Sequence, residues 1–310
     1  MGVKLLAKLL KTQCYDVSEQ VHLSCLYGKK ICIDVSIYLY RYKSQNALIE
    51  NFYLMCSLFK RYNITPIFVF DGKPPKEKRK ELDERREARK EAYRKYEELV
   101  GKCDDNITYD QKIELKNLKR KMVKIKREDV ELVQNLFDAY GIKYMTAIGE
   151  ADILCASLVL KKKVYAVLTE DMDLFAYTSP IVLRYFSLLN HTCILYDLKK
   201  ILKKLDIDKT NFQIVCVLSG NDYYNNKKNI FYYLRLFNKY KKRNENINFM
   251  DWIEKNNYLS TDEIEEVNKV LKMYMDVKKE LTNYNYFIIK TGSVDKEKLY
   301  NILEGERFVF

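Results

Sequence analysis

The chain has 310 residues, of which 47% are hydrophobic, and its formal net charge is +12. A chain of this length buries a substantial core, and no run of about eighteen apolar residues predicts a membrane span. Its eight cysteines are scattered without a CxxC pair, which is typical of reduced thiols in an intracellular protein. The basic excess favours an anionic partner such as nucleic acid, a membrane surface or an acidic protein.

Three short apolar runs predict buried parallel strands: Ile31 to Ile33, Ile67 to Phe70, and Val164 to Leu168. The helix-like segments Leu48 to Tyr62 and Ala151 to Leu160 precede the second and the third of these strands. Alternation of helices and strands is typical of an α/β domain, so we expect a parallel central sheet flanked by helices.

A highly charged segment interrupts this α/β pattern. Residues 76–102 carry alternating charges, residues 112–127 are strongly basic, and turn residues lie between them from Gly101 to Thr108. Both charged stretches have helical propensity, so we predict an inserted helical hairpin. The chain becomes helical and basic again after Asp222, most densely from Lys239 to Arg243. We therefore expect a core at residues 1–72 and 129–222, a helical arch at 73–128 and a helical region at 223–310.

Acidic residues follow the predicted strands where each strand ends. Asp34 comes directly after the first strand and Asp71 after the second, and Asp171 and Asp173 come just after the third. Ligands of an open parallel sheet bind beyond the carboxyl ends of its strands, so we expect these side chains to converge. Three more acidic residues share this layout: Glu150 and Asp152 at the start of a predicted helix, and Asp222 after the apolar run Ile214 to Leu218.

Seven carboxylates at one edge would repel one another strongly unless divalent cations neutralise them. Oxygen ligands without a nearby His or Cys select Mg²⁺ or Mn²⁺ over zinc. Two such ions about 4 Å apart can activate a water molecule and stabilise the leaving oxygen during phosphodiester hydrolysis. The sequence therefore predicts a site for two Mg²⁺ ions, for which Mn²⁺ can substitute.

Each acidic residue also has a purely structural explanation. A single Asp after a strand is commonly a turn residue or a helix cap. Glu150 and Asp152 could merely complement a helix dipole, and residues 171–173 could form a solvated loop. Repetition of the pattern after every predicted strand favours the metal-site hypothesis over these separate explanations.

Six stretches, in this order along the chain, carry a family resemblance: Met1 to Leu10, Ile33 to Tyr40, Val69 to Pro75, Gly149 to Asp152, Thr169 to Asp173, and Leu218 to Tyr223. In order and approximate spacing they resemble the motifs of the flap endonuclease family of structure-specific 5′ nucleases. The resemblance implies a PIN-like 5′-nuclease core, and an arch through or under which a single-stranded 5′ end passes.

The resemblance also implies a role for each acidic residue. One metal ion would be held by four of them and the second by three: Asp34, Asp71, Glu150 and Asp152 for the first, and Asp171, Asp173 and Asp222 for the second. At position 152 the family usually has Glu, so the shorter Asp keeps the charge and alters the reach.

Lys78 and Arg85 match the family's catalytic cations on the helix that closes over the scissile phosphate. They are seven residues apart, about two helical turns, so both would face one side and clamp the charge developing on a phosphate. The structural alternative is a solvated helix with ion pairs such as Glu81 with Arg85.

Other matches concern DNA binding. Tyr40 matches an aromatic residue on which a base near the cut stacks, although its apolar neighbourhood also suits a core tyrosine. Gly2, in the matching amino-terminal segment, is expected to contact nucleic acid. Where the family places a glycine-rich, often potassium-binding turn, residues 224–230 contain no glycine, and Lys227 and Lys228 would contact duplex phosphates instead.

We interpret the chain as a structure-specific 5′ flap endonuclease of DNA replication, repair or recombination. The alternatives are a 5′→3′ exonuclease, a Holliday-junction resolvase, an RNA-processing nuclease and a catalytically inactive nucleic-acid-binding factor, the last disfavoured by the retained carboxylates. We expect a monomer that binds branched or flapped DNA, no membrane, and no sliding-clamp peptide, because Phe308 to Phe310 is too short to form one. The expected location is intracellular, in the nucleus or, for a viral protein, in the host cytoplasm or a virus factory.

Overall fold

The computed structural model describes residues 2–75, 78–101, 108–243, 245–284 and 292–306. Within these residues one sheet has the strand order β1-β7-β6-β5-β2-β3-β4. The strands are β1 Ser18–His22, β2 Lys30–Asp34, β3 Thr65–Phe70, β4 Tyr144–Thr146, β5 Ala166–Leu168, β6 Ile181–Ser187 and β7 Thr192–Asp197. Neighbours from β6 to β4 pair in parallel, whereas β7 pairs antiparallel with both β6 and β1. The predicted α/β class is confirmed, with an antiparallel edge added to the parallel centre.

The three predicted strands are confirmed as β2, β3 and β5, which lie side by side at the centre of the sheet. Ile31, Cys32 and Ile33 of β2 are almost completely buried. Strands covered on both faces have continuous apolar runs because neither side chain direction meets water. This burial is the physical reason that the central strands are visible in the sequence.

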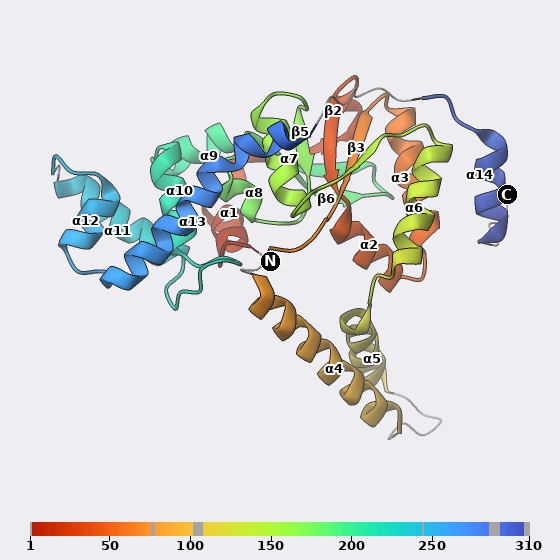
Figure 1. Ribbon diagram of the computed structural model, residues 1–310, viewed down its shortest axis with the longest axis horizontal. Helices are drawn as coiled ribbons and strands as arrows, with labels where there is room; N and C mark the ends of the chain where they lie inside the picture. The colour runs from red at the N-terminus through yellow and green to blue at the C-terminus, as the bar shows by residue number, and fades with distance from the viewer. Residues whose placement is uncertain (1, 76–77, 102–107, 244, 285–291, 307–310) are drawn as a thin grey trace.

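Helices cover both faces of the sheet (Figure 1). One face packs against α2 Val35–Ser44, α3 Leu48–Arg61, α6 Arg127–Ala139 and α14 Lys296–Gly305. The other face shares a continuous apolar core with α1 Leu6–Gln13, α7 Ala151–Leu160, α8 Asp173–Ala176, α9 Leu198–Leu205, α10 Lys209–Leu218, α11 Ile230–Arg243, α12 Phe249–Lys255 and α13 Thr261–Glu280. The helices between residues 209 and 280 therefore share one apolar core with the sheet, and this core fixes their position relative to the strands.

An arch of two helices, α4 Arg79–Gly101 and α5 Tyr109–Met122, projects from the body beside the amino terminus (Figure 1). Exposed ion pairs such as Arg94 with Glu91 and Glu98 support α4, and a capping box of Thr108 and Gln111 begins α5. The predicted inserted hairpin is thus present, while most of its predicted turn lies outside the described residues. Phe308 to Phe310 also lie outside them. No helix among the described residues has the length and apolarity needed to cross a bilayer.

Candidate active site

The carboxyl ends of β2 and β3 position the first two acidic residues. Asp34 ends β2 and caps α2, accepting hydrogen bonds from the Ser36 backbone N–H at 3.1 Å and from Thr169 Oγ1 at 3.1 Å. Asp71 follows β3 and accepts from the Ala151 backbone N–H at 2.8 Å and from Ser36 Oγ at 2.5 Å. Since Ser36 contacts both carboxylates and Ala151 begins α7, two strands and one helix are fixed against each other here.

Four more acidic residues reach the same edge from α7 and from the loop after β5. Glu150 immediately precedes α7, and Asp152 lies in its first turn and is buried. Asp171 Oδ1 accepts a hydrogen bond from the backbone N–H of Asp173 at 3.0 Å, which turns the loop back on itself. The carboxylates of Asp171 and Asp173 both lie close to Gly2 at the amino-terminal end of the chain.

Asp222 follows a helix, α10, through the short segment Ser219 to Asn221. The apolar run before it is the buried end of α10, which packs against α11 and α13. Gly2 brings the chain's start against the same carboxylates, and its backbone N–H donates to Asp222 Oδ1 at 3.3 Å. A Cβ at Gly2 would lie 2.5 Å from Asp171 Oδ1 and 2.6 Å from Asp173 Oδ1, so only glycine fits there.

Lys78 is a buried cation among these carboxylates. Its Nζ lies 2.5 Å from Glu150 Oε1 and 3.1 Å from Asp222 Oδ2, and 5.0 Å from the centroid of the Tyr223 ring. Burial alone would lower the pKa of Lys78, but the charges of Glu150, Asp152 and Asp222 outweigh it and hold this pKa well above its ordinary value. Lys78 lies just before α4, one residue ahead of the helix on which it was expected.

Burial, strengthened by neighbouring carboxylates, raises the pKa of three acidic groups at this edge. Burial, together with the charges of Asp71 and Asp171, raises the pKa of Asp34 to about 7. Burial also raises the pKa of Asp152 and of Asp173 well above the ordinary value, with neighbouring carboxylates adding to the shift. The ionised forms of these three carboxyl groups are therefore disfavoured unless cations accompany them.

A cavity of about 1060 Å³ separates this edge from the arch. Its walls include six of the seven predicted acidic residues: Asp34, Asp71, Glu150, Asp152, Asp171 and Asp222. The arch contributes basic residues to the same cavity: Arg85, Arg89, Lys95, Arg120 and Lys121. Lys78 and Arg85 thus line the same cavity, but Lys78 is buried and Arg85 is exposed.

Tyr40 of α2 also lines this cavity and is 45% exposed, whereas Tyr38 is fully buried in the core. The two tyrosines are on different faces of α2 because positions two apart on a helix do not point the same way. The alternative that Tyr40 is a core tyrosine is therefore wrong, since Tyr38 is the one in the core. The ring of Tyr40 is available to a ligand.

The donor set at this edge suits a divalent cation. Carboxylate oxygens without His or Cys are ligands for Mg²⁺ or Mn²⁺, and Oδ1 of Asp173 is buried without a hydrogen-bond partner among the described residues. As they stand, no three acidic, His or Cys side chains of the described residues converge on one point. Each predicted acidic residue is instead held by a protein donor, such as Lys78 for Glu150 and Asp222.

Two tyrosines hold the acidic residues and were missed in the sequence. The hydroxyl of Tyr223 donates to Glu150 Oε2, and the hydroxyl of Tyr274 donates to Asp173 Oδ2 at 3.0 Å. Tyr274 belongs to α13 and stacks on Tyr177 with centroids 4.5 Å apart. Tyr223 follows Asp222 directly and could have been suspected, but no sequence signal links Tyr274 to a residue 101 positions away.

Asparagines shape residues 224–229, the part of the connection between α10 and α11 in which the sequence has no glycine. Asn226 Nδ2 donates to the Leu218 carbonyl at 3.0 Å and to Tyr233 Oη at 2.7 Å, and Asn226 Oδ1 accepts from the Lys228 backbone N–H at 2.9 Å. Lys227 and Lys228 are exposed on this turn, the latter with Nζ 5.0 Å from the Tyr232 ring centroid. The turn is thus built by side-chain amides, and both lysines are accessible to a phosphate backbone.

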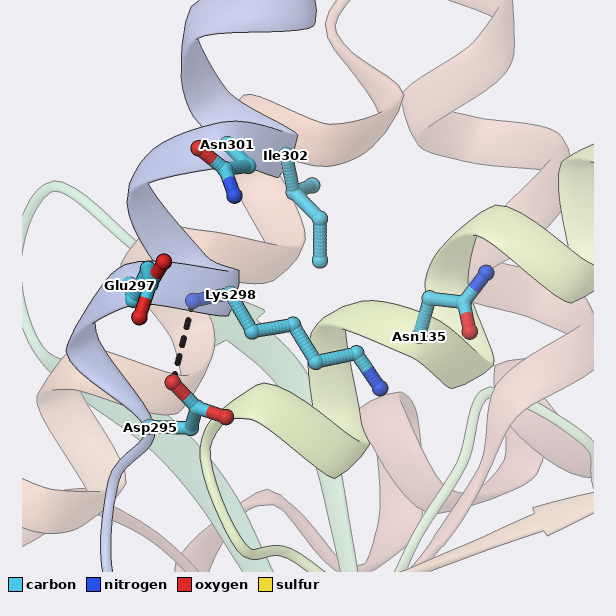
Figure 2. Close-up of a pocket in the computed structure, with 6 residues that line it drawn as sticks. All are labelled: Asn135, Asp295, Glu297, Lys298, Asn301 and Ile302. Carbon is cyan, nitrogen blue, oxygen red and sulfur yellow. Dashed lines mark hydrogen bonds between the residues drawn. The ribbon is translucent and has the colours of Figure 1, made fainter.

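A second pocket, of about 470 Å³, lies between α6 and α14 and shares no lining residue with the first (Figure 2). Asp295 caps α14 by accepting from the Lys298 backbone N–H at 3.0 Å, and its own N–H donates to the Ala139 carbonyl at 2.8 Å. These contacts attach α14 to α6, and we assign the pocket to helix packing.

Family models match the two parts of the chain that contain the acidic residues. The XPG N-terminal domain matches residues 1–92, and the XPG I-region matches residues 141–222. Flap endonuclease 1 of Encephalitozoon cuniculi is 34% identical over 254 residues, which are 74% of this chain and 70% of that protein. Flap endonuclease 1 of Meyerozyma guilliermondii is 30% identical over 276 residues, 83% of this chain and 71% of that protein.

Solved structures share the fold. The catalytic core of Rad2 in complex with DNA substrate aligns with a TM-score of 0.68 and 24% identity, covering 98% of this chain and 94% of that one. GEN1 in complex with product DNA, Mg²⁺ and Mn²⁺ aligns with a TM-score of 0.60 and 18% identity, covering 97% and 72%. The fold and the site thus define a nuclease, an enzyme that hydrolyses DNA. The chain belongs to the flap endonuclease and XPG family, and it is a structure-specific 5′ flap nuclease.

Proposed function

We propose that the edge formed by the seven acidic residues is the catalytic centre, and that it holds two Mg²⁺ ions, for which Mn²⁺ can substitute. The observation that carries this proposal is the cavity with acidic residues on one wall and arch cations on the other. Mg²⁺ and Mn²⁺ in the structure of GEN1 support the choice of ions. When bound, such ions supply an activated water and charge stabilisation at the leaving oxygen.

The chain's own residues would orient the substrate around that chemistry. Lys78 and Arg85 would stabilise negative charge that develops on the scissile phosphate, because both line the cavity, Lys78 among the acidic residues and Arg85 on the arch. Tyr40 would stack on a base beside the cut, and its exposed ring suits that contact. Gly2 would leave room for the substrate at Asp171 and Asp173, where a larger residue would block the approach.

Each of the three expected parts of the chain would have its own role in the reaction. Residues 1–72 and 129–222 would form the nuclease core, residues 73–128 the arch over the 5′ flap, and residues 223–310 would grip duplex DNA with Lys227 and Lys228 at the front. We propose a monomer acting on branched or flapped DNA inside the cell, in replication, repair or recombination. DNA-bound Rad2 supports this substrate class.

A substrate panel tests this function. Purified protein with Mg²⁺ is offered 5′ flap, nicked, blunt, four-way-junction and RNA flap substrates in parallel, and the products are sized to the nucleotide. We expect one dominant cut at the base of the DNA flap. Stepwise shortening from a blunt end would identify an exonuclease instead, symmetric paired cuts in the four-way junction would identify a resolvase, and preference for the RNA flap would identify an RNA-processing enzyme.

A further inference from the structure

Tyr185 has an unfavourable backbone conformation at a β-bulge. It lies in β6 with φ +55°, a left-handed value that is rare and unfavourable for a bulky residue. It also forms a β-bulge, in which Tyr185 and Phe186 lie opposite the single residue Cys193 of β7. Phe186 enters the core, but Tyr185 is 52% exposed, so its ring contributes little burial in return.

The bulge places Tyr185 at the catalytic edge of the sheet. Leu168 of β5 pairs in parallel with Leu183 of β6, so the next positions bring Tyr185 level with Glu170, the neighbour of Asp171. The Tyr185 backbone N–H donates to Glu170 Oε1 at 2.8 Å. The same carboxylate oxygen lies 3.3 Å from Arg41, which lines the active-site cavity.

The guanidinium group of Arg184 packs against one face of the Tyr185 ring. The Arg184 guanidinium lies over it, 4.7 Å from the centroid, and is itself buried and donates to the Glu170 carbonyl at 2.9 Å. Because Tyr185 is about half exposed, part of its ring remains accessible to a ligand. A fixed aromatic face backed by a guanidinium suits a flat π system, whereas the adjacent Glu170 carboxylate disfavours a phosphate.

We propose that Tyr185 is a second stacking platform, which binds a nucleobase of the DNA substrate that has one free face. That base is either an unpaired base of the flap or the exposed end of a duplex arm. The inference rests on the proposed function, because it assigns a further part of the same substrate to the same edge of the sheet.

Variants at position 185 separate stacking from folding. Tyr185→Ala removes the ring, Tyr185→Phe keeps it, and Tyr185→Gly removes it while relieving the left-handed backbone. The matched control is Tyr165→Ala, since Tyr165 is 37% exposed, has Lys29 Nζ 4.9 Å from its ring centroid and precedes β5 at the opposite edge of the sheet. Melting temperature is measured for each variant.

Affinity for a 5′ flap substrate is measured with Ca²⁺ in place of Mg²⁺, and again with single abasic positions along the flap and at both duplex ends. Tyr185→Ala and Tyr185→Gly should weaken binding roughly 5- to 100-fold, while Tyr185→Phe and Tyr165→Ala bind like the wild type. One abasic position should weaken the wild type but not Tyr185→Gly, and its place in the flap or at a duplex end identifies the base.

Unchanged affinity of Tyr185→Gly would overturn the proposal, as would equal losses at every abasic position in both proteins. Tyr185→Gly relieves the left-handed backbone, so it should melt no lower than Tyr185→Ala. If its melting temperature is also that of the wild type, its loss of affinity does not come from unfolding. Cleavage by Asp171→Asn is measured alongside. If Asp171→Asn is inactive while Tyr185→Gly binds normally, the catalytic centre stands and only the platform is wrong.

Discussion

Lys78 lies inside the group of acidic residues that would bind metal, paired with Glu150 and Asp222. An ammonium group in this place competes with a metal ion for the same oxygens. Lys78→Met should therefore bind Mn²⁺ more tightly than the wild type in the absence of DNA, as measured by calorimetry. It should also cleave a flap roughly 10²-fold more slowly in single turnover, because a preorganised charge donor is lost.

Arg85→Ala is the comparison for Lys78→Met, since Arg85 lines the same cavity but is exposed on α4 of the arch. It should slow cleavage by a similar factor and leave Mn²⁺ affinity unchanged. For both variants, DNA affinity should change much less than rate. A loss of DNA affinity in proportion to rate would make these residues ordinary phosphate contacts.

Tyr274 holds Asp173 from α13, and Tyr274→Phe removes only the hydroxyl while keeping the stack on Tyr177. Groups that orient metal ligands typically contribute 10- to 100-fold to metal affinity. We expect Tyr274→Phe to bind Mn²⁺ about tenfold more weakly in a calorimetric titration. Tyr240→Phe removes a hydroxyl bonded to the Ile247 carbonyl, remote from the acidic edge, and should bind Mn²⁺ normally. Equal metal affinity of Tyr274→Phe and wild type would contradict the assigned role.

Sequence reasoning reached the acidic residues because each lies in a short local motif at the end of an element. It could not reach Tyr274, whose position depends on how α13 packs against α7 and α10. Nor could it separate Tyr38 from Tyr40, because both lie in one apolar stretch and only the packing of α2 decides which ring is buried.

Among the elements, the turn after Asp222 departs from the family pattern, because residues 224–230 contain no glycine. Lysine side chains bind phosphates by releasing condensed counterions, and each contact adds about 0.9 to the salt slope. Changing Lys227 and Lys228 together to Ala should therefore reduce the slope by up to about 2. Affinity for a flap substrate is measured across a salt series, in sodium and in potassium separately, with Ca²⁺ present.

The pair Lys199→Ala and Lys200→Ala on α9 serves as the control for overall charge. Its salt slope should stay closer to that of the wild type, because α9 is separated from the turn (Figure 1). Binding should also be indifferent to replacing sodium by potassium. A clear potassium preference would show that the asparagine-built turn keeps an ion site without glycine.

The strands that sequence reasoning missed lie on either side of the three central strands that it predicted. β1 is mostly exposed, with only Val21 buried, so it has no continuous apolar run. In β6, the buried Arg184 and the bulge at Tyr185 interrupt the regular pattern. The apolar run before Asp222 proved helical, which periodicity cannot decide for a short buried segment.

At the scale of the whole molecule, acidic groups concentrated at one edge oppose folding until cations neutralise them. Mg²⁺ at about 100 times its dissociation constant should raise the melting temperature by about 5 °C. Asp152→Asn removes a buried carboxyl group whose pKa burial raises, so it should melt higher than the wild type without metal and respond less to Mg²⁺. Identical melting of wild type with Mg²⁺ and with EDTA would contradict metal binding at this edge.

The most direct test of the catalytic centre is single-turnover cleavage of a 5′ flap by Asp171→Ala. Asp171 is preferable to Asp34, because Asp34 also caps α2 and its loss would disturb the fold. Asp16→Ala is the control, since Asp16 pairs with Lys204 on the surface at 2.7 Å. We expect Asp171→Ala to bind the flap with Ca²⁺ like the wild type and to show no cleavage with Mg²⁺, while Asp16→Ala cleaves normally. Cleavage by Asp171→Ala at the wild-type rate would contradict the account.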